Sequence, residues 1–210
     1  MSADTGHRFL VELTAPPEDA DDEFNAWYDG ARLPRRRALE GVERAWRFQD
    51  TRNPSAWAAF YDLATPGILP ESRDELPEED AAMEARLARL ENREYVEIPI
   101  AAEHYRPLPE TPYLVQAVWW TPSADQLDDF HAWYAEEHIP LLLEVPGWLA
   151  IRRYRLVEGT GPAFLAIHYI ASDDVVNGPS HRRAADTPWR AKAASHRIQH
   201  ERRLFKAHNA

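Results

Sequence analysis

The stretch that decides the fold is "FHAWYAEEHIP", residues 130–140, because an earlier part of the chain repeats it. A shift of 106 residues places "FNAWYDGARLP", residues 24–34, on it without a gap. In the same register Gly41 meets Gly147 and Arg47 meets Arg153. A gap-free match of this length that contains a Trp-Tyr pair indicates an internal duplication.

The duplication predicts two domains of similar size in a chain of 210 residues. We expect a first domain over residues 1–108 and a second over 109–210. The proline-rich stretch "RPLPETP", residues 106–112, is the expected linker.

Each half has the pattern of strand, helix, strand, strand, helix, strand. In the second half "YLVQAVWW", "LAIRRYRL" and "AFLAIHYI" are typical of strands. Ser123 followed by Gln126 resembles a capping box, which predicts a helix from Ser123 to about Leu143.

The last helix of each half is predicted from composition and caps. Thr187 and Pro188 form a good helix start, and we expect that helix to reach about His200. The stretch "ERRLFK", residues 201–206, is then the final strand. In the first half "PEEDAAMEARLARLENR", residues 77–93, is the expected second helix.

The βαββαβ order is that of a ferredoxin-like unit, a sheet with helices on one face. The bare face of such a sheet needs a partner, which a duplicated chain contains. The sequence therefore predicts an α+β fold of two tandem ferredoxin-like βαββαβ units, packed sheet to sheet as a pseudo-dimeric α+β barrel.

Composition narrows the class of protein. The chain is 44% hydrophobic with eight tryptophans, enough for a core, and its net charge of -11 argues against nucleic acid or an anionic membrane as partner. It has no cysteine, no run of 18 apolar residues and no signal-peptide pattern at its start, so we expect a cytoplasmic protein. The preference for arginine over lysine indicates a GC-rich, bacterial genome.

Cofactor and metal motifs are missing from the sequence. It contains no GxGxxG, GxxxxGK[ST] or GxSxG pattern. His131 and His138 lie seven residues apart, roughly 10 Å along a straight helix, which is too far for one metal ion. The arginine-rich C-terminal part holds further histidines that we expect to face solvent: His181, His196, His200 and His208. We predict no cofactor and no metal.

Residues 130–143 carry the candidate chemistry. On a helical wheel one face collects Phe130, Trp133, Tyr134, Glu137 and Leu141, with His138 at its edge. Pro140 lacks a backbone donor and crowds the preceding turn, which predicts a kink or an end there. We interpret this stretch as the wall of a pocket.

The motifs "F-x-x-W-Y-x-E-E-H-x-P" and "P-G-x-x-x-x-R-R-Y", between Phe130 and Tyr154, resemble the dimeric α+β barrel superfamily, most closely its EthD-like branch. A degraded copy lies between Phe24 and Phe48. This superfamily includes muconolactone methylisomerases, polyketide cyclases such as olivetolic acid cyclase, cofactor-free quinone-forming monooxygenases and haem enzymes such as chlorite dismutase. The resemblance therefore implies a fold more strongly than a reaction.

The resemblance to the methylisomerases implies a working histidine at His138. A purely structural histidine is the alternative, with Glu137 paired to Arg152 or Arg153. The first half has Ala31 and Arg32 in place of Glu137 and His138. That half is then a scaffold or holds an anion pocket lined by Arg32.

Strand residues complete the candidate site. His168 and Gln116 line it if their face of the sheet meets the helices, and Tyr154 and Tyr169 do so otherwise. We prefer His168. The apolar walls would be Trp133, Tyr134 and Trp120.

These residues predict a cofactor-independent enzyme that acts on a small aromatic or polyketide-like molecule by isomerisation, cyclisation or lyase chemistry. His138 would be the general acid or base, oriented or charge-stabilised by Glu137, and His168 or Tyr154 would bind a carbonyl or enolate oxygen. Two alternatives remain: a non-catalytic small-molecule binding protein, and a haem-binding or cofactor-free monooxygenase relative. In solution we expect a monomeric pseudo-dimer or a homodimer.

Overall fold

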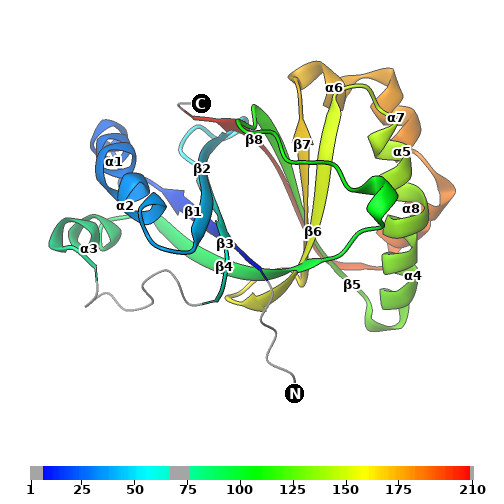
Figure 1. Cartoon of the computed structure of the whole chain (residues 1–210), viewed down its shortest axis with the longest axis horizontal. Coiled ribbons are helices and arrows are strands. Elements are labelled where there is room, and N and C mark those ends of the chain that lie inside the picture. Colours follow the sequence, from blue (N-terminus) through cyan, green and yellow to red (C-terminus); the bar gives the residue numbers. More distant parts are fainter. Residues whose placement is uncertain (1–6, 67–75, 209–210) are drawn as a thin grey trace. The chain divides into compact units, whose positions relative to one another are not determined.

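The computed structural model describes residues 7–66 and 76–208, which fold as two compact units. The first unit holds the described residues up to Glu97 together with Val157–Thr160, and the second holds Ile98–Leu156 and Gly161–His208. Each unit combines a four-stranded antiparallel sheet with helices, shown in Figure 1. The βαββαβ order predicted from the duplication is confirmed in each.

The first unit has the strand order β4-β1-β3-β2. Its elements are β1 (Arg8–Ala15), α1 (Asp21–Trp27), a π turn (Tyr28–Arg32), α2 (Leu33–Arg37), β2 (Val42–Asp50), β3 (Trp57–Leu63), α3 (Glu78–Glu84) and β4 (Arg89–Ile98).

The second unit repeats this arrangement with the order β8-β5-β7-β6. Two short 3₁₀ turns, Ala102–His104 and Ala124–Gln126, precede β5 and α4. The other elements are β5 (Leu114–Pro122), α4 (Leu127–Trp133), a π turn (Tyr134–His138), α5 (Ile139–Leu143), β6 (Trp148–Glu158), β7 (Phe164–Ile170), α6 (Asp173–Asn177), α7 (Pro179–Ala185), α8 (Pro188–Ser195) and β8 (Arg197–Ala207).

Two predicted helices are too long. The helix expected over 77–93 ends at Glu84, because Arg89–Ile98 pairs with β1 as a strand. The helix expected to reach His200 ends at Ser195, because β8 begins at Arg197 and pairs with β5. In both cases sheet pairing overrides the helical preference of a charged, alanine-rich stretch.

The start of α4 also differs from its prediction. The chain forms a 3₁₀ turn first, α4 begins at Leu127, and no side chain caps it, so the capping box proposed for Ser123 and Gln126 is wrong. Thr187 does cap α8, as predicted, because its side chain accepts a hydrogen bond from the backbone N–H of Arg190.

The helix through residues 127–143 continues past Pro140, so the predicted end there is wrong. A π turn absorbs the proline instead: the N–H of Ile139 donates to the carbonyl of Tyr134, five residues earlier. The first unit has the same device before Pro34, where the N–H of Leu33 donates to the carbonyl of Tyr28. A wider turn removes the crowding that a proline ring imposes on an α-helix.

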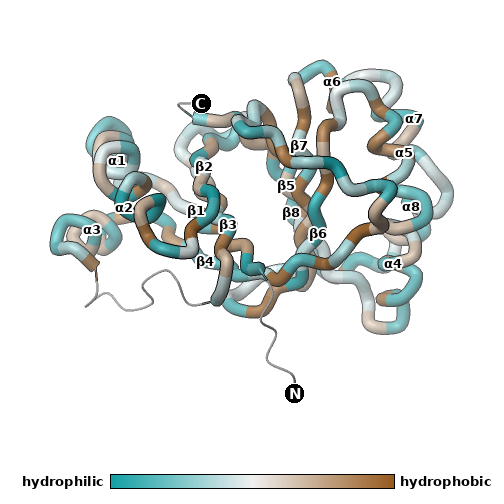
Figure 2. Tube along the Cα trace, in the orientation of Figure 1, coloured by the Kyte–Doolittle hydropathy of each residue, from teal (hydrophilic) through white to brown (hydrophobic). Residues whose placement is uncertain are grey.

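A hydrophobic core lies between the sheet and the helices of each unit. In the second unit it includes Trp120, Phe130, Trp133 and Ile170, and in the first unit Phe24, Trp27 and Tyr61. Figure 2 shows hydrophobic segments recurring along the strands. No helix in the described part of the chain combines the length and apolar character needed to cross a membrane.

Candidate active site

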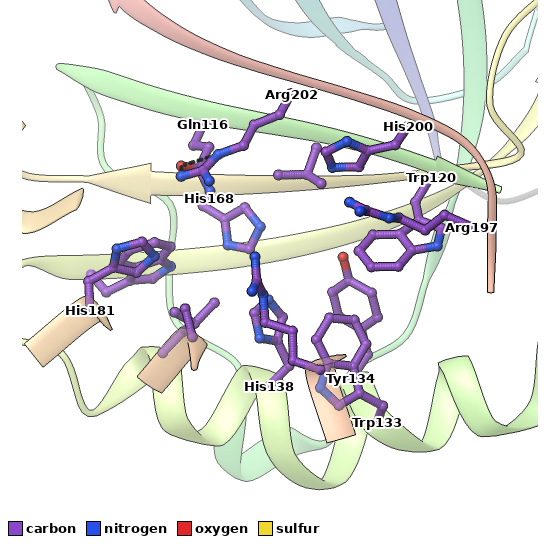
Figure 3. Close-up of a pocket in the computed structure, with 15 residues that line it drawn as sticks. Gln116, Trp120, Trp133, Tyr134, His138, His168, His181, Arg197, His200 and Arg202 are labelled. Atoms are coloured by element: carbon purple, nitrogen blue, oxygen red, sulfur yellow. Dashed lines mark hydrogen bonds between the residues drawn. The ribbon is translucent and has the colours of Figure 1, made fainter. Parts of the chain in front are cut away.

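A pocket lies in the second unit between the helices and the sheet face that they cover. Its cavity is about 80 Å³. Figure 3 shows side chains from three sources around it. Strands β5 and β7 supply Gln116, Trp120 and His168, the helix of residues 127–143 supplies Trp133, Tyr134 and His138, and the C-terminal segment supplies histidines and arginines.

The π turn aims His138 into this cavity. Because the turn spans five residues, it brings residues i and i+5 to the same side of the helix. The rings of Trp133 and His138 accordingly stack, with centroids 4.3 Å apart and an angle of 26° between their planes. A regular helical wheel places His138 only at the edge of this face.

The same π turn directs the side chain of Glu137 away from the pocket, and Glu137 is not one of the lining residues. Its Oε1 accepts hydrogen bonds from Trp133 Nε1 at 3.2 Å and from Thr187 Oγ1 at 2.6 Å. It makes no hydrogen bond with His138 and no ion pair with Arg152 or Arg153. The prediction that Glu137 orients His138 is therefore wrong, and so is the predicted arginine pair; Glu137 instead ties α4 to the start of α8.

His138 and His168 form the centre of the site. Figure 3 shows their rings approaching one another from the helix and from β7, and the centroids lie 6.2 Å apart. The Nδ1 atom of each ring is buried and has no hydrogen-bond partner among the described residues.

Both histidines are neutral at pH 7. Burial, together with the nearby His168 and Arg190, lowers the pKa of His138 well below its usual 6.5. Burial, together with Arg202, lowers the pKa of His168 to about 3. Removing an imidazolium from water costs free energy, and adjacent cations add to that cost.

Three arginines also belong to the polar lining. Arg202 donates from Nε (3.1 Å) and Nη2 to the Oε1 of Gln116. Arg197 donates from Nε to the carbonyl of Ala194 at 3.0 Å, and its guanidinium lies 5.1 Å from the centre of the Trp120 ring. Arg190 also lines the cavity, whereas none of the lining residues is an aspartate or a glutamate.

Tyr134 presents a hydroxyl to the cavity. Its oxygen makes no hydrogen bond with any residue that the structure describes. The guanidinium of Arg153 lies 3.9 Å from the centre of its ring. Burial raises the pKa of Tyr134 to about 12, with Arg153 acting in the opposite direction, so the hydroxyl is a neutral donor at pH 7.

The strand face that meets the helices is the one that carries Gln116 and His168, which pair directly across β5 and β7. Arg153 contacts Phe130 and Tyr134 on that side of β6, so its neighbour Tyr154 points to the opposite face. Tyr154 does not line the pocket, and its predicted part in substrate binding is wrong.

In the first unit the corresponding position is filled by ion pairs. Arg32, which aligns with His138, bonds to Glu12 through Nε (3.1 Å) and Nη2 (2.7 Å) and lies 2.6 Å from Glu84. Arg36 adds a third contact to Glu12 at 2.7 Å. Burial opposes ionisation of Glu12, but Arg36 and Arg32 outweigh it and hold its pKa far below the usual range. The anion pocket considered for Arg32 is excluded, because carboxylates already occupy its guanidinium.

Sequence reasoning missed the C-terminal contribution to the pocket. His181 and His200 line it, although both were expected to face solvent. The pairing of β8 with β5 explains His200 and Arg202, because their partners on β5 are Trp120 and Val118. The sequence could have revealed these residues if the last helix had been predicted to end at Ser195. Residues 200 and 202 would then lie in the final strand, two positions apart, with their side chains on the same face.

Among the described residues no group of three or more histidine, aspartate or glutamate side chains could hold a metal ion. The polar groups that face the cavity are proton acceptors, neutral donors and fixed cations. Together they can take up a proton and stabilise an anion formed beside it.

No protein-family model and no curated protein matches the sequence. Solved structures do match along nearly its whole length. A chlorite dismutase from Candidatus Nitrospira defluvii is similar with a TM-score of 0.69 and 8% identity, over 98% of this chain and 92% of that one. An anthrone oxidase-like protein gives 0.65 and 12%, over 100% and 94%.

A ferredoxin-fold protein related to antibiotic biosynthesis monooxygenases, from Listeria monocytogenes, gives a TM-score of 0.53 and 12% identity, over 98% of each chain. Identities this low show the fold alone. The chain therefore has the ferredoxin-like fold of the dimeric α+β barrel proteins, with two such units in tandem.

Proposed function

We propose that the second unit is the catalytic half of an enzyme that removes a proton from a small carbonyl or hydroxyaromatic molecule. The observation that carries this proposal is the pair of neutral histidines, His138 and His168, which face one cavity with unpartnered nitrogens. Neutral imidazole is the form that accepts a proton, and both rings remain in that form at pH 7.

The low pKa values set a condition on the substrate. A buried imidazolium is unfavourable alone, so proton transfer needs an anion to form next to it in the same step. An enolate or phenolate oxygen meets this condition, because its charge pairs with the new imidazolium. The hydroxyl of Tyr134 and the side-chain amide of Gln116 are neutral donors at the cavity that would bind such an oxygen.

Oxygenation is the fate of this anion that the comparisons favour, because similar folds belong to an anthrone oxidase-like protein and a relative of monooxygenases. The carbanion carbon would bond to O₂, the imidazolium proton would complete a hydroperoxide, and loss of water would leave a carbonyl. In sum, a CH₂ group and O₂ give C=O and H₂O, with the substrate as the only reductant. The narrower resemblance to the EthD-like branch remains a prediction from the motif.

A haem does not fit this pocket. Its volume of about 80 Å³ accommodates a few water molecules or part of a small ring, since one water needs on the order of 10–15 Å³ by this measure. A porphyrin would have to displace the stacked pair of Trp133 and His138. We therefore expect the purified protein to show no Soret band.

The test uses acetylacetone, a small diketone with an acidic CH₂ group, and follows O₂ consumption and formation of the triketone product. His138→Ala and His168→Ala should each slow turnover by at least about 100-fold, the usual contribution of a general base. His7→Ala is the matched control, because His7 is an exposed residue of the first unit. Folded His138 and His168 variants that turn over as fast as the wild type would sink the proposal.

A further inference from the structure

Arg190 has a charge for which the described part of the protein provides no counterion. Its backbone N–H is used in the cap of α8, but its guanidinium makes no hydrogen bond or ion pair with any described residue. The other two arginines of the pocket are engaged, Arg202 with Gln116 and Arg197 with Ala194. A cation at a pocket wall without an acidic partner is available to a ligand.

The charged side chains that line the pocket around Arg190 are all cationic. Three arginines line it and no acidic residue does, although the whole chain carries a net charge of -11. Burial is the main cause of the lowered pKa values of His138, His181 and His200, and the charge of Arg190, which lines the same cavity, lowers each of them further. An anion bound here would relieve repulsion among these groups.

The chemistry of the site selects a carboxylate. A guanidinium offers parallel donors that match the two oxygens of a carboxylate. The cavity is small, and indole rings of Trp133 and Trp148 flank it, which suits a planar group attached to a conjugated system. The proton-abstracting histidines then act on a different part of the same molecule.

We propose that the substrate of this site carries a carboxylate and that Arg190 is the specificity-determining residue that binds it. This inference rests on the proposed function, because it assigns the substrate class of the same pocket. It does not depend on the oxygen chemistry, because a carboxylate can bind whether or not it is turned over.

Calorimetry on the full chain tests the carboxylate site with two matched pairs of probes, benzoate with benzamide and acetate with acetamide. The wild type should bind at least one carboxylate at least about tenfold more tightly than its neutral amide, the usual gain from a charge-assisted bidentate pair. Arg190→Gln should abolish that preference. Arg190→Lys should retain only part of it, because lysine keeps the charge and loses the fork.

Arg183→Gln is the control for overall charge, since Arg183 is an exposed residue of α7 outside the pocket lining, and it should leave the preference unchanged. Equal binding of carboxylate and amide by the wild type, or no binding of either carboxylate at millimolar concentration, would overturn the inference. A preference that survives Arg190→Gln would also overturn it.

His138→Ala separates the two proposals. If it keeps the carboxylate preference and loses turnover, both stand. If it keeps both, the proton-transfer proposal fails and the carboxylate site remains. If the wild type shows no preference while His138→Ala loses turnover, the carboxylate site fails alone.

Discussion

Tyr28 and Tyr134 occupy the same position in the two units, but their hydroxyls have different surroundings. Tyr28 donates to Glu12 at 2.6 Å and lies 2.9 Å from the hydroxyl of Tyr61. In the second unit Val118 replaces Glu12 and His168 replaces Tyr61, so the hydroxyl of Tyr134 faces a cavity instead. Arg32 of the first unit is replaced by His138 in the second, which is the third such difference. These three differences between the units distinguish a closed ion-pair cluster from a pocket.

The ion-pair cluster gives a stability prediction. Glu12→Ala should destabilise the protein by about 3–5 kcal/mol, because it leaves Arg32 and Arg36 buried without their shared carboxylate. Urea unfolding measures this change. Turnover per folded molecule should not fall, because the cluster belongs to the first unit; a large loss of turnover would contradict the assignment of the site to the second.

The buried histidines give a pH prediction. A histidine whose folded pKa lies below its unfolded value stabilises the protein only while it is neutral, so stability falls as the pH drops below about 6.5 and continues to fall towards the folded pKa. For His168, with a pKa of about 3, the slope approaches about 1.4 kcal/mol per pH unit. His168→Asn should flatten unfolding free energies measured between pH 6 and pH 4 by roughly this slope. An unchanged slope would show that His168 is not buried in its neutral form.

At the scale of elements, Thr187 supplies one of the contacts that hold α8 in place; Trp189 and Lys192 of the same helix also bond to Asp129 of α4. Thr187 caps its first turn and donates to Glu137, which joins it to the helix that carries His138. Thr187→Ala should cost about 1–2 kcal/mol in unfolding free energy and weaken carboxylate binding through Arg190. Thr187→Ser keeps the hydroxyl and should restore both. Weakened stability with unchanged binding would mean that α8 does not position Arg190.

The helices also show what the sequence could predict. The duplicated motif and the alternation of the strands were sufficient for element order and for placing His168 and Gln116 on one face. The π turns were not foreseen, because a wheel of constant period cannot represent a local five-residue turn. As a result, the helical wheel placed Glu137 on the inner face and His138 at its edge, whereas His138 faces the pocket and Glu137 does not. The last helix was drawn too long because helix propensity ignores the pairing of β8 with β5.

At the scale of the whole molecule, the duplication places two ferredoxin-like units in one chain. Proteins of this fold commonly obtain the second unit from another subunit, and this chain contains both. We therefore predict a monomer with the mass of one chain, 24.2 kDa. Light scattering coupled to size exclusion measures that mass, and a stable species of twice the mass would favour the homodimer.

Only the second unit has a pair of histidines at its pocket, and the central claim is that both of them, His138 and His168, are neutral at pH 7. Nuclear magnetic resonance of nitrogen-labelled protein reports the charge of each imidazole directly during a titration. We predict that His138 and His168 are both neutral at pH 7, and that His168 gains its proton only near pH 3. Single substitutions assign the two signals. A positive charge on either ring at pH 7 would contradict the account, because a protonated imidazole cannot be the base.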